Sequence, residues 1–223
     1  MLDDEEWKWV GEHATGDFDH LLVATSLPWL LGRGMHYGEA WSEAVAGGAW
    51  GGPGARGAEK IRQAVDMEHW AAFQDSFARL ADLFRAIGTG ERGEPPASIV
   101  ALSGDVHHAY LFEVGYPRGT GMRTRVWQAV CSPYRNPLDK KERRQIRMAL
   151  SRPEAWASRA IARLAGVRDP GIGWRMTGDG PWFDNQVATL TIDGPRIDMR
   201  LDKAVPVDEH DARLECVLEQ RLA

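Results

Sequence analysis

The sequence predicts an α/β domain, and three stretches of the chain support this prediction. Residues 99–102, Ile-Val-Ala-Leu, run without a break into Ser-Gly, which is typical of a strand buried on both faces of a sheet. Apolar residues recur at threes and fours across residues 58–87, which predicts a long helix that packs on a sheet. Residues 186–192 and 196–201 alternate around Asp-Gly-Pro and predict a β-hairpin.

Composition limits the class of protein. With 223 residues, 43% of them hydrophobic and 26% charged, the chain is globular and long enough to bury a sizeable core, as one domain or part of a larger one. The net charge of −5 argues against a nucleic-acid partner, and no run of apolar residues is long enough to predict a membrane span. Cys131 and Cys216 lie far apart without metal-ligand spacing, so we expect reduced thiols, with one disulfide as the alternative. A cytoplasmic location is therefore expected, any export signal lying outside this chain.

The N-terminal residues predict a helix, a turn and a strand. Acidic residues 3–6 open the helix, where the first-turn amides favour negative charge. Residues 16–19, Gly-Asp-Phe-Asp, are similar to a Gly-Asp-x-x-Asp metal motif, but the spacing is one residue short, so we interpret them as a turn. Residues 20–27 then predict a buried strand that Pro28 stops.

Residues 31–57 predict a long loop, because nine of these positions are glycine. Two interpretations are open: a substrate-facing lid whose tryptophans form an apolar wall, or a Gly-rich surface insertion. In the helical stretch that follows, Asp66 and His69 are three residues apart, so they share a face and can pair.

The second half of the chain predicts further strands and helices. Residues 110–114 and 123–131 predict strands, and the basic residues 140–150 and 153–164 predict two helices with solvated faces. A phosphate-attracting field is the alternative role for these cations, although the acidic chain as a whole weakens it. Residues 208–222 carry leucines and a valine at helical spacing, which predicts a short amphipathic helix.

The candidate functional residues follow directly after the predicted central strand. Gly104 permits a sharp turn and a close approach of the backbone to an ion. Asp105 and His107 follow at the strand's C-terminal end, where α/β sheets place ligands, and offer a carboxylate oxygen and an imidazole nitrogen to one cation or a pair. The alternative is a capping aspartate beside a surface histidine. Arg135 and Asn136 follow the predicted strand 123–131 and could reach a phosphate oxygen, or lie in a solvated loop.

The stretch Gly-Asp-Val-His-His-Ala-Tyr, residues 104–110, resembles the last metal-binding motif of the calcineurin-like metallophosphoesterases, and most closely that of the PhoD-like alkaline phosphatase family. Four further stretches are similar to segments of that family: residues 1–10, 21–28, 131–137 and 182–186. The resemblance implies the C-terminal half of an α/β/β/α sandwich with mixed sheets. It covers residues 1–204, including the Gly-rich loop 31–57, and leaves residues 205–223 as a C-terminal helical tail.

The resemblance also implies a reaction, namely metal-dependent hydrolysis of phosphate esters. Two or more metal ions would be required, with iron, calcium, zinc and manganese as candidates. Asp105 and His107 would be metal ligands, and His108 would be catalytic, either orienting a ligand or donating to the phosphate or the leaving group. A phosphate ester substrate is thus the expected small-molecule partner.

The sequence departs from the family in one respect. Nothing in residues 1–96 matches the family's earlier metal motifs, and one aspartate with one or two histidines cannot complete a binuclear site. Two functions are therefore expected as alternatives. The chain is part of a phosphoester hydrolase that needs its missing N-terminal half as a partner, or it is a non-catalytic remnant that binds phosphate or metal.

Overall fold

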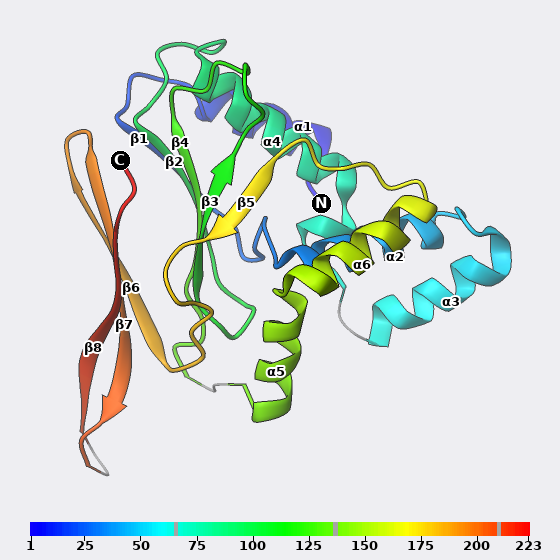
Figure 1. Cartoon of the computed structure of the whole chain (residues 1–223). Coiled ribbons are helices and arrows are strands. Elements are labelled where there is room, and N and C mark those ends of the chain that lie inside the picture. The colour runs from blue at the N-terminus through cyan, green and yellow to red at the C-terminus, as the bar shows by residue number, and fades with distance from the viewer. Residues whose placement is uncertain (65–66, 136–137, 209–210) are drawn as a thin grey trace. The chain divides into compact units, whose positions relative to one another are not determined.

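The computed structural model describes residues 1–64, 67–135, 138–208 and 211–223 (Figure 1). The chain divides into two compact units. We call Trp29–Leu80 with Asp139–Pro170 the helical unit, and Leu2–Pro28, Ala81–Leu138 and Gly171–Ala223 the sheet unit. The predicted fold class is confirmed at the level of an α/β protein with a mixed sheet.

The sheet unit contains a five-stranded mixed sheet with the strand order β1-β2-β4-β3-β5. Strands β1, β2 and β4 are parallel to one another, whereas β3 runs antiparallel to both β4 and β5. The predicted buried strand is β2, between two parallel neighbours, and its first four residues are buried. The bounds are β1 His20–Ala24, β2 Ser98–Ser103, β3 Tyr110–Gly115, β4 Arg125–Val130 and β5 Gly173–Met176.

The N-terminal helix α1, Asp4–His13, begins where the acidic residues predict it. Asp3 and Glu6 form a capping box, in which each carboxylate accepts a hydrogen bond from the other residue's backbone amide. Trp7 is the buried residue of this helix. Local capping chemistry therefore accounts for the start of α1.

A second, antiparallel sheet contains β6 Gln186–Asp193, β7 Arg196–Pro206 and β8 Ala212–Arg221. The predicted hairpin is confirmed as β6 and β7. The predicted helical tail is wrong, because β8 pairs with β7 along its whole length. An irregularity in register at Leu201/Asp202 disturbs the two-residue alternation of β8, so its apolar residues fall at apparently helical spacing.

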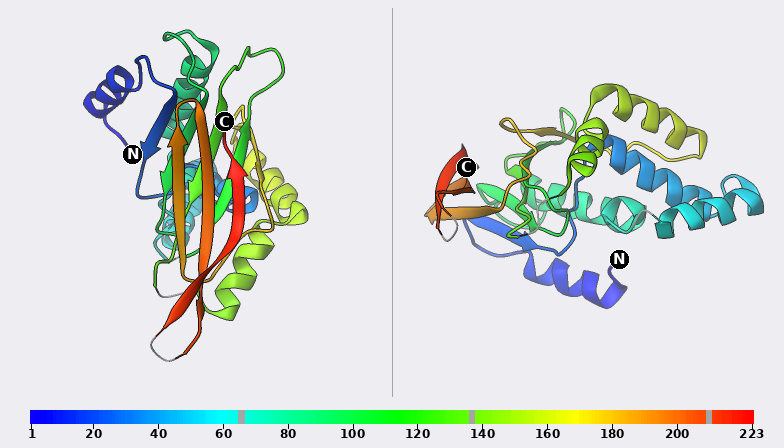
Figure 2. Two further views of the ribbon diagram at one scale, coloured as in Figure 1. Left: turned by 90° about the vertical axis from the view of Figure 1, so that its left-hand side faces the viewer. Right: turned by 90° about the horizontal axis from the view of Figure 1, so that it is seen from below.

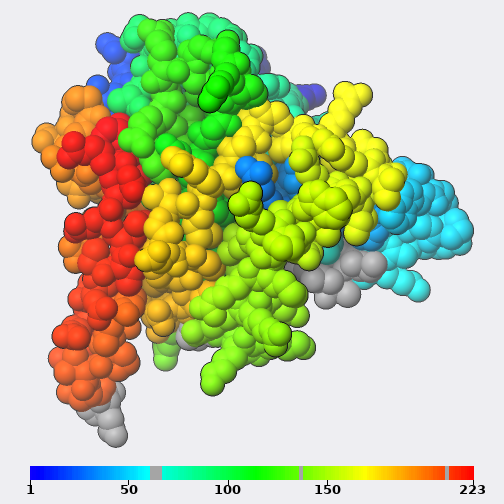
Figure 3. Space-filling view, in the orientation of Figure 1, coloured from blue at the N-terminus to red at the C-terminus, as the bar shows by residue number. Residues whose placement is uncertain are grey.

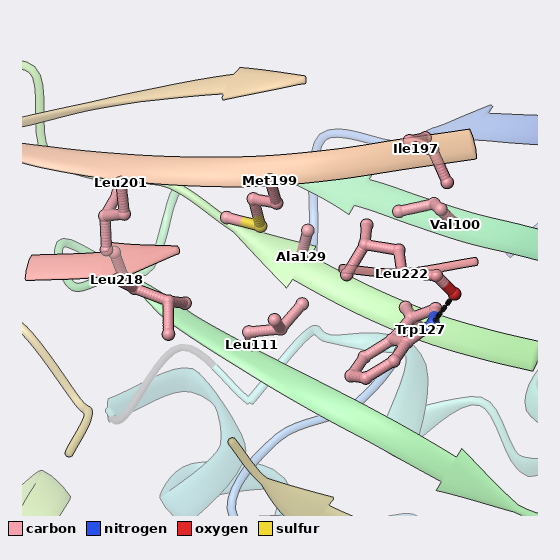
Figure 4. Close-up of a cluster of buried hydrophobic side chains, with 10 residues drawn as sticks. Val100, Leu111, Trp127, Ala129, Ile197, Met199, Leu201, Leu218 and Leu222 are labelled. Carbon is pink, nitrogen blue, oxygen red and sulfur yellow. Dashed lines mark hydrogen bonds between the residues drawn. The ribbon is translucent and has the colours of Figure 1, made fainter. Parts of the chain in front are cut away.

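The core of the sheet unit lies between its two sheets (Figure 4). Leu111, Trp127 and Ala129 of the larger sheet pack in one cluster with Met199 and Leu201 of β7. The indole nitrogen of Trp127 donates a hydrogen bond of 2.8 Å to the carbonyl oxygen of Leu222, which joins the C-terminus to the cluster. The last part of helix α4, Gln74–Thr89, covers the opposite face of the larger sheet (Figures 1 and 2). This gives a helix, sheet, sheet order of layers.

The helical unit corrects the prediction of a long loop over residues 31–57. These residues form helix α2 and the start of α3, and the unit also contains two further helices, a 3-10 turn and the first part of α4. Their bounds are α2 Arg33–Ala46, α3 Gly51–Ala64, η1 Trp70–Ala72, α5 Lys140–Ala149 and α6 Arg152–Leu164. Gly34 of α2 serves close packing rather than flexibility, because a Cβ atom there would lie 2.6 Å from the carbonyl oxygen of Ala149.

The long helix predicted over residues 58–87 is also interrupted. Helix α3 ends at Ala64, the turn η1 follows, and α4 begins at Gln74. Asp66 lies outside the described residues. The Nδ1 atom of His69 lies 2.7 Å from the buried carboxylate of Glu39, with which it forms a hydrogen bond.

Gly34→Ala should destabilise the protein by about 1–3 kcal/mol, because the new methyl group would meet a backbone oxygen that cannot rotate away. Gly38→Ala is the matched control on the same helix. Nothing lies within 4 Å of the methyl group there, so we expect stabilisation of about 0.5–1 kcal/mol from helix propensity. Urea unfolding of the two variants measures both effects, and equal effects would contradict the close packing of α2.

Candidate functional site

The candidate site lies where β2 ends and the chain turns into β3. Gly104 donates its amide to the carbonyl oxygen of Ser26 at 3.3 Å, and Val106 donates to Gly104 at 2.9 Å, so the turn is tied to the chain that follows β1. A Cβ atom on Gly104 would be 3.5 Å from the carbonyl oxygen of Cys131, an ordinary contact. The turn therefore lies at the C-terminal edge of the parallel strands β1, β2 and β4.

Asp105 and His107 share an uncommon backbone conformation. Their φ angles are +69° and +54°, and among the described residues they are the non-glycine residues with positive φ. Both side chains are exposed. This conformation is strained for residues other than glycine and persists where the surrounding structure imposes it, which occurs most often at functional sites. The turn thus holds a carboxylate and an imidazole at the surface, with one residue between them.

The chain after β4 is joined to this turn. The amide of His107 donates to the hydroxyl oxygen of Ser132 at 3.2 Å, and the amide of Cys131 donates to the carbonyl oxygen of Ser103 at 3.1 Å. Arg135 is exposed three residues beyond Ser132, in the same loop. Asn136 lies outside the described residues. The structure therefore places the loop that carries Arg135 beside the turn, and no hydrogen bond or ion pair joins Arg135 to Asp105.

His108 differs from Asp105 and His107 because it is buried. Its Nδ1 atom lies 2.6 Å from the carbonyl oxygen of Val106, so that nitrogen carries the proton in this bond and Nε2 is the basic one in the neutral ring. The ring stacks on Phe183, with 5.7 Å between centroids, and lies 5.2 Å from the ring of Tyr110. A buried and anchored ring is suited to fixing the turn in place.

A third segment completes the surroundings of the turn. Ala109 and Trp182 exchange backbone hydrogen bonds of 2.8 and 3.0 Å, and the amide of Gln186 donates to the carbonyl oxygen of Pro133 at 3.1 Å. The side-chain amide of Gln186 donates to Trp182 as well. The stretches around His107, Ser132 and Trp182 are thus hydrogen-bonded to one another, although they are far apart in the sequence.

Sequence reasoning assigned no structural role to the residues that hold this arrangement together, although they lie in the stretches 131–137 and 182–186 that resemble the family. Ser132 could have been found, because it follows a strand that is parallel and adjacent to β2, so both strand ends meet at one edge. The contacts of Phe183 and Gln186 could not be predicted from strand order, because they depend on the isolated bridge between Ala109 and Trp182.

The fit of this site to metal ions can be tested from its donors. A carboxylate and an imidazole are suitable ligands for zinc, iron or manganese. Within the described part of the chain, however, no group of three or more His, Cys, Asp or Glu side chains could hold a metal ion. Burial raises the pKa of the Cys131 thiol, which keeps it neutral and unsuited to act as a ligand or nucleophile. The residues present therefore fit a share of a metal site rather than a whole one.

Comparison with known proteins gives little further guidance. No protein-family model and no curated protein sequence matches this chain. A solved structure of PhoD matches over the whole chain with a TM-score of 0.44 and 12% sequence identity. The chain spans 35% of that structure's length. A likeness at this level carries no argument about function, so the proposal below depends on the residues themselves.

Over the residues that the structure describes, no helix combines the length and apolar character needed to cross a bilayer.

Replacing Asp105 or His107 by glycine should stabilise the sheet unit by about 0.5–1 kcal/mol each, because glycine adopts positive φ without strain. The control is Asp179→Gly, an exposed aspartate without positive φ, where glycine should be neutral or destabilising. Urea unfolding measures all three. If Asp105→Gly and Asp179→Gly behaved alike, the turn would not be strained.

Proposed function

We propose that this chain supplies part of the metal site of a phosphoester hydrolase, with Asp105 and His107 as two of the metal ligands. The observation that supports this most is the pair of exposed, strained side chains at the end of a buried strand. Glycine would adopt this backbone conformation without strain, so a carboxylate and an imidazole kept in it are candidates for a functional role. The resemblance of residues 104–110 to a phosphoesterase metal motif agrees with this assignment.

The proposed role of each residue depends on its position in the turn or in the adjoining loop. Metal ions bound here would polarise a phosphoryl oxygen and lower the pKa of a bound water. His108, anchored to the carbonyl of Val106, would orient the turn that presents the two ligands. Arg135 is exposed in the adjoining loop, where its guanidinium could pair with a phosphate oxygen, and Asn136 is proposed beside it.

Two donors are too few for a binuclear centre, so the remaining ligands must come from elsewhere. We propose a further segment or chain, corresponding to the N-terminal half of such a hydrolase, as the partner that completes the site. Until that partner is present, metal binding by this chain should be weak and hydrolysis slow.

Metal binding by the full chain tests the proposal directly. Isothermal titration with Mn²⁺ and with Zn²⁺ should show weak binding that Asp105→Asn and His107→Gln each reduce by about tenfold or more. Matched controls are Asp179→Asn and His13→Gln, an exposed aspartate and an exposed histidine elsewhere. Wild-type affinity in both site variants would remove the assignment.

Turnover of p-nitrophenyl phosphate and bis(p-nitrophenyl) phosphate separates the two functions. Slow, metal-dependent hydrolysis that both site variants abolish would support the hydrolase. Metal or phosphate binding with no turnover of either ester would favour the non-catalytic alternative. Hydrolysis that survives Asp105→Asn together with His107→Gln would overturn the site itself.

A further inference from the structure

Charge is unevenly distributed along the chain, and two helices of the helical unit carry an excess of positive charge. Residues 139–164, which contain α5 and α6, hold eight Lys and Arg against three Asp and Glu. Their net charge is +5, whereas the whole chain carries −5, so the remainder carries −10. In Figure 3, α5 and α6 (lime to yellow-green) lie together on the face turned to the viewer. An acidic protein with one basic surface has a field that selects a negatively charged partner.

Two groups of cations can be distinguished on this surface by their ion pairs. Arg159 and Arg163 both pair with Asp169, which also accepts a hydrogen bond from the hydroxyl of Tyr37. These contacts hold the pKa of Asp169 well below its usual range, the bond from Arg159 being the largest cause. Within residues 139–164, by contrast, four cations form no ion pair with a described residue: Lys140, Lys141, Arg144 and Arg152. These four cations are therefore available to an external anion.

Large apolar side chains are exposed among these cations. On α6, the exposed positions Arg152, Trp156, Ala160 and Leu164 recur every four residues and form one outward face. Trp156 is 74% exposed and Leu164 78%, which is unusual for such large side chains outside an interface. The indole nitrogen of Trp50, itself partly exposed, donates to the carbonyl oxygen of Leu164 at 3.4 Å and extends the apolar area.

We propose that this basic and apolar face, formed by α5 and α6, binds the surface of an anionic lipid bilayer. Lysine and arginine are attracted to acidic headgroups, and an exposed tryptophan favours the boundary between headgroups and acyl chains. Leu164, Met148 and Ile161 can insert beside it, because each is about half exposed or more. Aliphatic side chains have no equivalent role against nucleic acid, where aromatic stacking and phosphate contacts dominate. The helices lie on the surface in this arrangement, and none crosses it.

Co-sedimentation with vesicles tests the proposal on the full chain. We expect binding to phosphatidylcholine vesicles that contain phosphatidylserine, and little binding to vesicles of phosphatidylcholine alone. Trp156→Ser should weaken binding by about tenfold or more, and Arg144→Gln by about fivefold. Both side chains are exposed, so neither substitution should disturb folding, which circular dichroism can verify. High salt should reduce the binding that remains in Trp156→Ser.

Matched controls lie in the sheet unit. Trp9→Ser removes a tryptophan that is 60% exposed on α1, and Arg118→Gln removes one exposed arginine, so both should bind as the wild type does. Effects equal to those of Trp156→Ser and Arg144→Gln would overturn the proposal. So would equal binding to both kinds of vesicle, or binding to a single-stranded oligonucleotide without binding to vesicles. A dimer in light scattering that Trp156→Ser dissolves, with no vesicle binding, would assign the face to a second copy instead.

Discussion

Trp127→Ala is expected to lower the free energy of unfolding by about 3–5 kcal/mol, because it removes the largest side chain between the two sheets. Trp127 is 1% exposed and packs in the cluster with Leu111 and Leu222. The substitution leaves a cavity that the surrounding strands can fill only in part. It also leaves the carbonyl oxygen of Leu222 without its 2.8 Å hydrogen bond, inside the core.

Two further variants separate these contributions. Trp127→Phe keeps most of the apolar area but cannot donate to Leu222, so its loss should be smaller, about 1–3 kcal/mol. Trp156→Ala removes an exposed tryptophan and should change stability by less than about 0.5 kcal/mol. Urea unfolding followed by circular dichroism measures all three. If Trp127→Ala cost no more than Trp156→Ala, the two sheets would not pack on each other through this residue.

The elements predicted well from sequence are those whose pattern is local. The apolar run that became β2 needs burial on both faces, and only the middle of a sheet provides it. The first turn of α1 is specified by Asp3 and Glu6 alone, since each caps the other's amide. The β6–β7 hairpin is likewise determined by a two-residue alternation around Gly194, whose φ is +53°.

Two wrong predictions, the loop over residues 31–57 and the C-terminal helix, have a common physical cause, which is packing between segments that are distant in the sequence. Glycines in α2 suggested a loop, yet Gly34 is there because the backbone of α5 approaches too closely for a side chain. The apolar spacing of β8 suggested a helix, yet pairing with β7 across an irregular register determined the outcome. Neither the packing of Gly34 against α5 nor the pairing of β8 with β7 can be deduced from the neighbouring residues in the sequence.

In the candidate site, too, some features are determined by the local sequence and others by tertiary packing. The position of Asp105 and His107 at the end of β2 could be predicted from the order of apolar, glycine and polar residues. Their positive φ angles could not be predicted, because aspartate and histidine indicate a left-handed backbone conformation much less strongly than glycine does. Nor could the bond from His107 to Ser132, which depends on β2 and β4 being neighbours. The identity of the ligands is thus local information, whereas their orientation is tertiary.

Lowering the pH from about 6.5 to about 4 should cost the helical unit about 3 kcal/mol of stability, through a histidine outside the candidate site. His36 on α2 is fully buried and packs against the rings of Tyr37 and Phe77, at 5.3 and 4.8 Å between centroids. Burial, with the positive charge of Arg33 as a smaller cause, lowers the pKa of His36 from 6.5 to about 4. The folded protein therefore resists protonation that the unfolded chain accepts.

The sign of the effect follows from proton binding in the two states. Above pH 6.5 His36 is neutral in both, so it contributes no pH dependence. Between pH 6.5 and 4 the unfolded chain binds the proton and the folded chain does not, so falling pH favours unfolding. Below pH 4 both states are protonated and the loss is complete, at about 3 kcal/mol for a pKa difference of this size. Asp169 affects stability in a lower pH range than His36 does. Its carboxylate has a lowered pKa, so it stabilises the fold fully above pH 3.8, the ordinary pKa of the group, and this contribution is lost as the pH falls below that value.

His36→Leu separates this effect from other titrations, because leucine fills a similar apolar space and binds no proton. Unfolding by urea, measured at intervals between about pH 4.5 and pH 7.5, should show a steep loss of stability for the wild type and a flatter curve for His36→Leu. The exposed histidine on α1 provides the control, since His13→Gln should leave the wild-type slope unchanged. Buried imidazole is the cause only if the difference between wild type and His36→Leu grows as the pH falls. Parallel curves would mean that other groups carry the acid sensitivity and that His36 is protonated as readily in the folded chain as in the unfolded one.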